Sequence, residues 1–354
     1  MKSISLPVLT GLAHGVSDAV AGFLVVRVLM LNSIPPVDYI LLYNTLAFGL
    51  QPVVGMIIDT LNIPRRATAV GLFLSATSLI LAWFSLIWGI LFAGLGSAIF
   101  HAGGGSLALT STPGRAAGPG IFAAFGVIGL ALGSQLAFYF SVTTIAIFFL
   151  VLLILAAAVC FFSASSNLVS KPAPIPVGTD IEWLAVGLVL AVALRSLVWS
   201  GIQPNMAGYS HLALFIALAA GFGKLAGGFL ADHIGWRTFT LAAMLMCILL
   251  LTVRNESLWL LLAGIFLLQS VTPLSLAALG RLMPSSPALA SSLVLGVGVL
   301  LGSLPLIFLG DGWLNVSISI PMLLLLSGGL YLFTLRGFPK FPENTQTIDP
   351  LRRS

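Results

Sequence analysis

Long apolar runs recur along this chain, and one of the clearest extends from Val142 to Phe162 without a charged residue. A helix needs roughly 20 mainly apolar residues to cross about 30 Å of hydrocarbon, so a run of this length is typical of a membrane span. Hydrophobic residues make up 59% of the sequence and charged residues only 7%, a balance that soluble domains do not have. A transmembrane β-barrel would instead show short alternating segments. The sequence therefore predicts an all-α, multi-spanning membrane protein.

The apolar segments predict twelve transmembrane helices, separated by short polar loops. The expected spans are 6–30, 39–58, 67–84, 88–109, 119–140, 142–162, 183–201, 209–231, 238–253, 257–279, 288–310 and 314–335. The first span is long and contains His14 and Asp18, which is unlike a cleaved signal peptide. We therefore expect it to stay in the mature protein.

Basic residues are distributed unevenly over the predicted loops, and this predicts the orientation. Only Arg254 falls on the side opposite the N-terminus. Cytoplasmic loops carry an excess of Lys and Arg, so both termini are expected in the cytoplasm and the protein in a plasma membrane, the bacterial inner membrane. This distribution accounts for the net charge of +5 without a nucleic-acid site. The basic residues on the cytoplasmic side are Lys2, Arg65, Arg66, Arg115, Lys171, Arg237, Arg281, Arg336, Lys340, Arg352 and Arg353.

A polar, proline-containing segment separates two halves with related sequences. We expect an N-terminal six-helix bundle at 1–163, a cytoplasmic linker at 164–181, and a C-terminal six-helix bundle with a short tail at 182–354. The glycine pattern of Gly126–Ser134 returns in Gly296–Ser303, at an offset of about 170 residues. A parallel repeat of this kind is typical of transporters whose pseudo-symmetric halves rock about a central site.

Asp18 is the only carboxylate well inside a predicted span. At about 1.5 Å per residue it lies roughly 18 Å from Leu6, near the middle of the membrane. His14 lies one helical turn before it, and His101 has a similar depth in the fourth span. These three residues are candidates for a proton-coupling site, because buried ionisable groups in spans mark ion pathways. The alternative is a polar cluster that only joins the first span to the fourth.

Two cations in the C-terminal half, Arg195 and Lys224, have no acid beside them in sequence. Facing a cavity they would suit an anionic substrate, and Arg binds carboxylates in a bidentate manner. Alternatively, Lys224 extends toward the cytoplasm or Arg195 pairs with Asp18. Neutral polar residues are further substrate-binding candidates, although each could instead bond a neighbouring helix. They are Asn44, Gln51, Gln135 and Gln269.

Two cytoplasmic loops repeat a pattern of aspartate followed by arginine. Asp59 precedes Arg65 and Arg66, and Asp232 precedes Arg237. Such pairs predict gating loops in which an aspartate–arginine latch holds neighbouring helices together and releases them on rocking.

These loops resemble a known signature. The stretch from Gly228 to Arg237 is similar to the G-x-x-x-D-R/K-x-G-R/K-R/K motif of the major facilitator superfamily, and the first loop resembles a degenerate copy. Within that superfamily the chain resembles the fosmidomycin-resistance type of efflux protein, which implies efflux by proton exchange. The similar stretches are Leu12–Asp18, Leu50–Gly55, Gly94–His101 and Gly280–Pro284.

The chain also departs from that type of efflux protein. After the span-4 histidine, where the family tends to have proline and a carboxylate, it has Ala102–Gly105. An acid that would carry protons is therefore missing. The fifth span has Gly126, Gly129 and Gly133 but no proline among them, so it matches only part of the antiporter signature.

Together these features predict a secondary active transporter with the major facilitator fold, which exports a small organic anion or amphipathic drug in exchange for protons. A uniporter, an uptake carrier and a receptor-like member without flux remain alternatives. The chain lacks the H-E-x-x-H, G-x-S-x-G and P-loop motifs, so we expect no enzyme activity, cofactor or metal, and an ion or substrate gradient as the energy source. The expected partners are the substrate, the proton and the lipid bilayer, and a monomer is expected.

Overall fold

The described part of the chain consists of helices. The computed structural model describes residues 2–30, 36–139, 141–162, 180–202, 212–253, 257–310, 314 and 317–338, and every regular element among them is a helix. Ten helical segments in these ranges are long and apolar enough to cross a membrane, and two shorter apolar helices span Trp236–Thr252 and Ser319–Thr334. Each of the twelve overlaps one predicted span, so the predicted all-α membrane architecture is confirmed.

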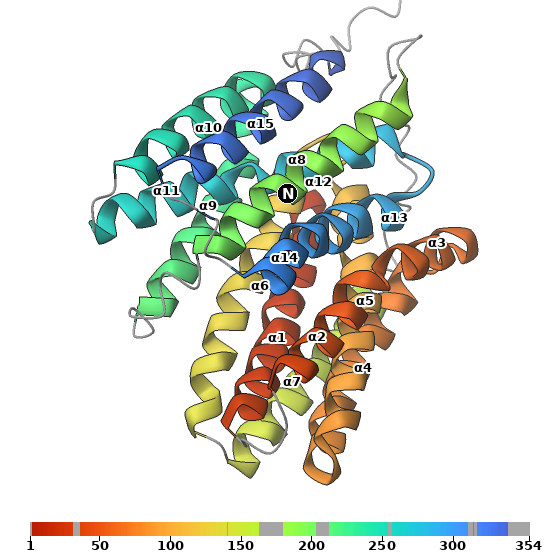
Figure 1. Cartoon of the computed structure of the whole chain (residues 1–354). Helices are drawn as coiled ribbons and strands as arrows, with labels where there is room; N and C mark the ends of the chain where they lie inside the picture. Colours follow the sequence, from red (N-terminus) through yellow and green to blue (C-terminus); the bar gives the residue numbers. More distant parts are fainter. Residues whose placement is uncertain are drawn as a thin grey trace, which may run out of the picture.

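Figure 1 shows how the described helices are arranged. Up to residue 162 they are α1 (Lys2–Met30), α2 (Pro36–Asn44), the π-helical segment η1 (Thr45–Gly49), α3 (Gln51–Leu61), α4 (Pro64–Phe84), α5 (Leu86–Ser111), α6 (Ala117–Leu136), the 3-10 turn η2 (Ala137–Tyr139) and α7 (Val142–Phe162). From residue 181 they are α8 (Ile181–Ile202), α9 (Ala213–Ile234), α10 (Trp236–Thr252), α11 (Leu258–Ser270), α12 (Thr272–Leu282), α13 (Pro287–Ser292), the π-helical segment η5 (Leu293–Val297), α14 (Gly298–Leu309), α15 (Ser319–Thr334) and the 3-10 turn η6 (Leu335–Gly337).

Three predicted spans are interrupted in their interior. The second consists of α2, η1 and α3, the tenth of α11 and α12, and the eleventh of α13, η5 and α14. Pro52 and Pro273 each occupy the second position of the helix that follows a break. Proline lacks an N–H donor and fits the first turn of a helix, so these breaks have a local cause in the sequence.

Two large buried clusters form the interior. One is built from α1, α2, α4, α5, α6 and α7 around residues such as Phe23 and Phe100. The other is built mainly from α8 to α13, η5 and α15 around residues such as Leu188 and Tyr331, and it also takes in Leu109 and Ala123 from α5 and α6. Figure 1 shows α10, α11 and α15 on the opposite side of the molecule from α4 and α7. The linker predicted at 164–181 lies mostly outside the described residues, so the division into halves stays a prediction.

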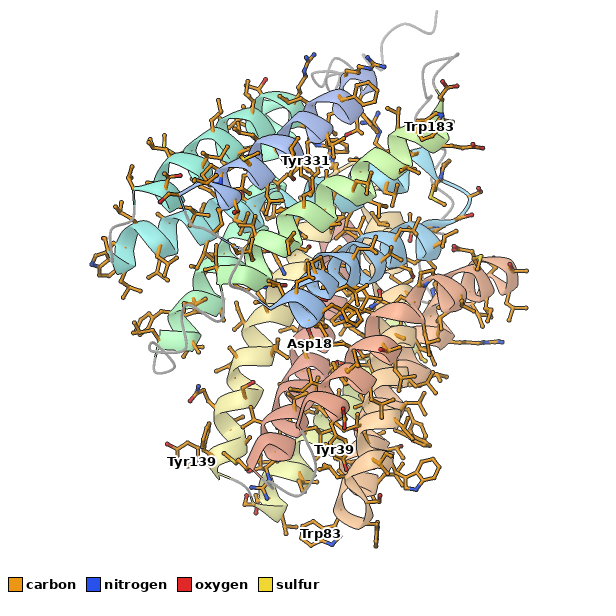
Figure 2. All side chains as sticks on the ribbon, in the orientation of Figure 1. Asp18, Tyr39, Trp83, Tyr139, Trp183 and Tyr331 are labelled. Atoms are coloured by element: carbon orange, nitrogen blue, oxygen red, sulfur yellow. The ribbon has the colours of Figure 1, made fainter. Side chains whose placement is uncertain are left out.

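Large apolar side chains also cover the outside of the helices. Phe84, Ile147 and Leu325 are more than half exposed. In water such a surface would be unfavourable, whereas the acyl chains of a bilayer solvate it. Exposed aromatic residues mark both ends of the bundle in Figure 2, with Trp83 and Tyr139 at one end and Trp183 at the other, as expected for the two membrane interfaces.

Glycines permit the closest helix contacts. A Cβ atom at Gly129 or Gly133 would overlap the backbone of Gly15 or Ala19, so α6 packs directly on α1. Between the two buried clusters, a Cβ atom at Gly105 would overlap Ser291, which brings α5 against α13. Small residues at such crossings let helix backbones approach within a membrane.

Candidate functional site

Asp18 lies at the centre of a cluster of three ionisable side chains. Its Oδ2 atom is 3.2 Å from Nε2 of His14, and its Oδ1 atom is 3.7 Å from Nε2 of His101. The side chain of Asp18 is 17% exposed, whereas both histidines are buried. Figure 2 labels Asp18 near the middle of the molecule, far from Trp83 and Trp183 at the ends. The structure therefore brings together the three residues predicted for proton coupling, and both histidines contact Asp18.

Backbone carbonyls fix how the two imidazoles are oriented. Nδ1 of His14 lies 2.8 Å from the carbonyl oxygen of Phe122, and Nδ1 of His101 lies 2.8 Å from that of Ser97. A carbonyl oxygen only accepts hydrogen bonds, so each Nδ1 is assigned as the donor and each Nε2 faces Asp18. An unprotonated Nε2 and an ionised carboxylate can only accept hydrogen bonds, so neither can donate one to the other. The 3.2 Å contact between His14 and Asp18 is a hydrogen bond only when a proton lies between them.

Aromatic packing and one glycine hold His14 in this position. Its ring stacks on Phe122 with centroids 4.5 Å apart and meets the His101 ring edge-on at 4.6 Å. A Cβ atom at Gly126 would overlap the imidazole of His14. The glycine of α6 therefore provides the space that the histidine of α1 occupies.

The predicted cations of the C-terminal half are also close to one another. Arg195, on α8, is 3% exposed and donates from Nη1 to Oε1 of Gln269 at 3.2 Å. Its Nε–H has no hydrogen-bond partner among the described residues. The ammonium of Lys224, on α9, interacts electrostatically with both Arg195 and Asp18. Lys224 therefore lies within electrostatic range of both Arg195 and Asp18, and Gln269 holds Arg195.

The other predicted polar residues are placed differently. Gln51 is buried, donates from Nε2 to the carbonyl of Ala47 at 2.6 Å, and leaves its Oε1 atom without a partner among the described residues. Asn44 is half-buried at the start of η1, and Gln135 is exposed near the end of α6. Gln269 is thus the one of these four that directly contacts a predicted cation in the described part of the chain.

The two loop aspartates bind helix N-termini. Asp59 accepts from the backbone N–H groups of Ala288 at 3.0 Å and Leu289 at 2.8 Å, in the first turn of α13. Asp232 accepts from those of Ala116 at 2.8 Å and Ala117 at 3.0 Å, where α6 begins. The first N–H groups of a helix lack partners within it and carry partial positive charge, so a carboxylate there is stabilised. Each aspartate therefore ties together two helices that lie far apart in the sequence, α3 with α13 and α9 with α6.

The arginines of the predicted latch differ in exposure. Arg66 and Arg237 are exposed, and Arg65 is half-buried. Sequence reasoning identified the two carboxylates and missed what they bind, because backbone donors have no sequence signature. It also missed Trp236, whose Nε1–H donates to Oδ1 of Asp232 at 3.0 Å.

Two polar residues next to the Asp18 cluster were also missed. Tyr43, on α2, is buried, and its hydroxyl forms a hydrogen bond with the side chain of Ser97. The same hydroxyl lies within electrostatic range of Asp18. Ser97 precedes His101 by one helical turn, and its hydroxyl lies 3.1 Å from Nδ1 of that histidine. The turn spacing of Ser97 and His101 was a usable signal, whereas Tyr43 reaches the cluster only through tertiary packing.

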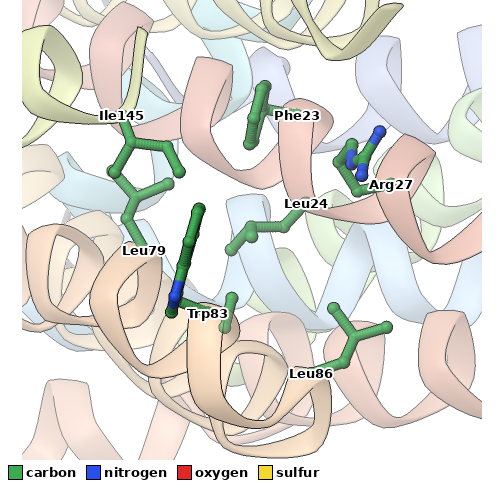
Figure 3. A pocket seen from close by; sticks show the side chains of 8 residues that line it. Phe23, Leu24, Arg27, Leu79, Trp83, Leu86 and Ile145 are labelled. Atoms are coloured by element: carbon green, nitrogen blue, oxygen red, sulfur yellow. The ribbon is translucent and has the colours of Figure 1, made fainter. Parts of the chain in front are cut away.

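A separate cavity of about 290 Å³ lies between α1, α4, α5 and α7 (Figure 3). Its lining is mostly apolar, with Arg27 and Trp83 as the polar side chains. Trp83 marks the end of the molecule nearest this cavity in Figure 2. None of the residues that line it belongs to the Asp18 or Arg195 clusters.

Comparisons with known proteins concern the fold. No protein-family model and no curated protein matches the sequence. The structure is similar to that of the E. coli fucose:proton symporter FucP, with a TM-score of 0.63 and 13% identity over 94% of this chain and 97% of that one. A structure of FucP in the outward conformation has a TM-score of 0.66 and 13% identity, over 94% of this chain and 99% of that one. The human organic anion transporter TETRAN has a TM-score of 0.66 and 13% identity, over 94% of this chain and 98% of that one. The chain therefore has the fold of major facilitator superfamily transporters.

Proposed function

We propose that this chain is a secondary transporter that mediates proton-coupled efflux of a small organic anion or amphipathic drug by alternating access. The observation that carries the proposal is a pair of charge clusters within electrostatic range of each other. Asp18 with two histidines belongs to the expected half 1–163, and Arg195 with Lys224 to the expected half 182–354. Buried ionisable groups inside membrane spans are costly and mark ion or substrate pathways. The major facilitator fold and the resemblance to fosmidomycin-resistance proteins support the same function.

Lys224 is the group through which we expect proton and substrate to influence each other. An ionised Asp18 attracts the ammonium of Lys224, with which it interacts electrostatically. A protonated Asp18 no longer does so, which leaves Lys224 and Arg195 available to an anion. Protonation of Asp18 then strengthens anion binding, and by linkage a bound anion favours protonation. This positive linkage is the one expected for co-transport of an anion with a proton. Efflux in exchange for protons instead requires a substrate, such as a cationic amphipathic drug, that binds while Asp18 is ionised and competes with the proton.

The two aspartate caps form the gate in this proposal. Asp59 and Asp232 hold together the end of the bundle at which α3 and α9 finish. The excess of Lys and Arg assigns this end to the cytoplasm, with both chain termini on that side and the protein in the bacterial inner membrane. The described conformation is then closed toward the cytoplasm, and rocking of the six-helix halves 1–163 and 182–354 opens it.

Proton movement in proteoliposomes tests the proposal. The purified chain is reconstituted with a pH-sensitive dye inside the vesicles, and organic anions, phosphonates and cationic drugs are added in turn. We expect at least one anion to change the internal pH, Asp18→Asn to abolish that change, and Asp38→Asn to preserve it. Asp38 is the matched control because it is exposed in the first turn of α2. Unchanged proton movement in Asp18→Asn would rule out the aspartate as carrier.

The same assay decides between exchange and co-transport. The structural likeness to a fucose:proton symporter favours uptake as the second candidate function. Substrate that enters with protons acidifies the vesicle interior, whereas substrate that enters in exchange for protons makes it alkaline. If no compound in the panel produces flux or thermal stabilisation, the receptor-like alternative is favoured.

A further inference from the structure

The Asp18 cluster brings three metal-ligand atoms together. One ring nitrogen of His14, one of His101 and a carboxylate oxygen of Asp18 all lie within 4.8 Å of one another. Two atoms bound to one Zn²⁺ ion at about 2.0–2.2 Å lie roughly 3.3–3.6 Å apart at the tetrahedral angle. The 3.2 Å contact of His14 with Oδ2 of Asp18 lies just below this range, and the 3.7 Å contact of His101 with Oδ1 lies just above it.

The orientation of both histidines is that of metal ligands. Metal-binding histidines almost always donate their second ring N–H to a carboxylate, a backbone carbonyl or water, which fixes the ring and makes the free nitrogen more basic. His14 and His101 both do this, through Phe122 and Ser97 at 2.8 Å. With the proton on Nδ1, each Nε2 carries a free lone pair, and this is the tautomer that can bind a cation through Nε2. Both lone pairs lie on the side of Asp18.

We propose that His14, Asp18 and His101 form a binding site for one divalent transition-metal ion such as Zn²⁺ or Co²⁺. Imidazole suits Zn²⁺, Co²⁺ and Ni²⁺, whereas Mg²⁺ and Ca²⁺ prefer sites made of oxygen atoms. Three protein ligands leave at least one coordination position for water or an anion. Asp18 is the most exposed of the three side chains and gives the ion access. The site goes beyond the proposed function, because binding can be measured without any transport.

Lys224 is the charge that opposes the ion. Its ammonium interacts electrostatically with Asp18 and with His101, and Arg195 interacts with Lys224 in turn. A divalent ion at the cluster must therefore bind in the repulsive field of this ammonium. Removal of this charge is expected to strengthen metal binding, which a purely structural role of the cluster does not predict.

Co²⁺ titration of the purified chain in detergent tests the site. A tag without histidine is used, and the visible d–d absorption of bound Co²⁺ is followed and then reversed with Zn²⁺. We expect one Co²⁺ per chain. His14→Asn and His101→Asn are expected to raise the Kd at least tenfold, because even residues outside the first coordination shell contribute 10–100-fold. His233→Asn is the control, because His233 is exposed and lies outside the cluster.

Lys224→Gln keeps the test decisive if the histidine variants unfold. This variant retains all three ligands, and we expect it to bind Co²⁺ more tightly than the parent chain. The proposal is overturned if the folded parent binds no stoichiometric Co²⁺ or Zn²⁺. It is also overturned if Lys224→Gln leaves the affinity unchanged or if the double variant His14→Asn/His101→Asn binds as the parent does. A chain that binds metal without moving protons contradicts only the proposed transport.

Discussion

Asp59 and Asp232 are expected to set how often one end of the bundle opens. Each carboxylate accepts two backbone N–H groups of a helix in the other half. In Asp232→Asn one oxygen remains as an acceptor and the second becomes an NH₂ group that faces a donor. The loss comprises one charge-assisted hydrogen bond, about 1.5–3 kcal/mol, and the interaction with the helix dipole, about 0.3–1 kcal/mol.

We take about 2 kcal/mol for each variant, near the lower end, because both aspartates are half-buried. At about 1.4 kcal/mol per factor of ten, this raises the population open at that end roughly 30-fold. The two sites lie on different helix pairs, so their effects are expected to add to about 4 kcal/mol in the double variant.

Thiol labelling of Leu109→Cys measures this opening. Leu109, on α5, is 8% exposed and packs within the buried cluster of the C-terminal half, so a reagent reaches it only when the halves separate. Cys160 and Cys247 are first replaced by alanine. We expect labelling to accelerate roughly 30-fold in Asp232→Asn and to stay unchanged in Asp38→Asn. An unchanged rate in Asp59→Asn/Asp232→Asn would refute the conclusion that these caps hold the end closed.

Two further substitutions test the interior of the site. Gly126→Ala is expected to lower the free energy of unfolding by about 1–3 kcal/mol and to disturb proton movement, because the added Cβ overlaps the imidazole of His14. Thermal unfolding measures the first effect and the vesicle assay the second. Gly329→Ala is the control and should not destabilise the chain, because a Cβ there meets open space. Arg195→Lys is expected to weaken anion binding at least tenfold in a thermal-shift titration, because Lys cannot bind an anion bidentately while donating to Gln269. An anion affinity equal to that of the parent chain would contradict a role of Arg195 in contacting the substrate.

Hydropathy was sufficient to predict the helical segments, because a span must be apolar over its whole length whatever it packs against. The same reasoning located Asp18, since one carboxylate within an apolar run is conspicuous. Its contact with His14 follows from the helical repeat. Its contact with His101 does not, because 83 residues separate them and only the packing of α1 against α5 brings them together.

The sequence was a weaker guide to which way a polar side chain faces. Gln135 and Gln269 both occur in apolar spans, yet Gln135 is exposed and Gln269 is buried against Arg195. Which way each glutamine faces depends on how its helix is rotated about its own axis, and neighbouring helices set that rotation. A span that is apolar on all sides carries no sequence pattern that predicts it. The loop aspartates show the same limit, because their partners are backbone N–H groups of distant helices.

The π-helical segments η1 and η5 contact each other although about 250 residues separate them in the sequence. A π-helical turn contains about one residue more than an α-helical turn, so each of these spans carries a surplus residue at their crossing. If the π-helical turn shifts along its span, each residue that it passes rotates by about 100° relative to the rest of the helix, because its register changes by one residue. The second and eleventh spans can therefore exchange the side chains they present to each other by a local register shift, without rigid tilting of either helix.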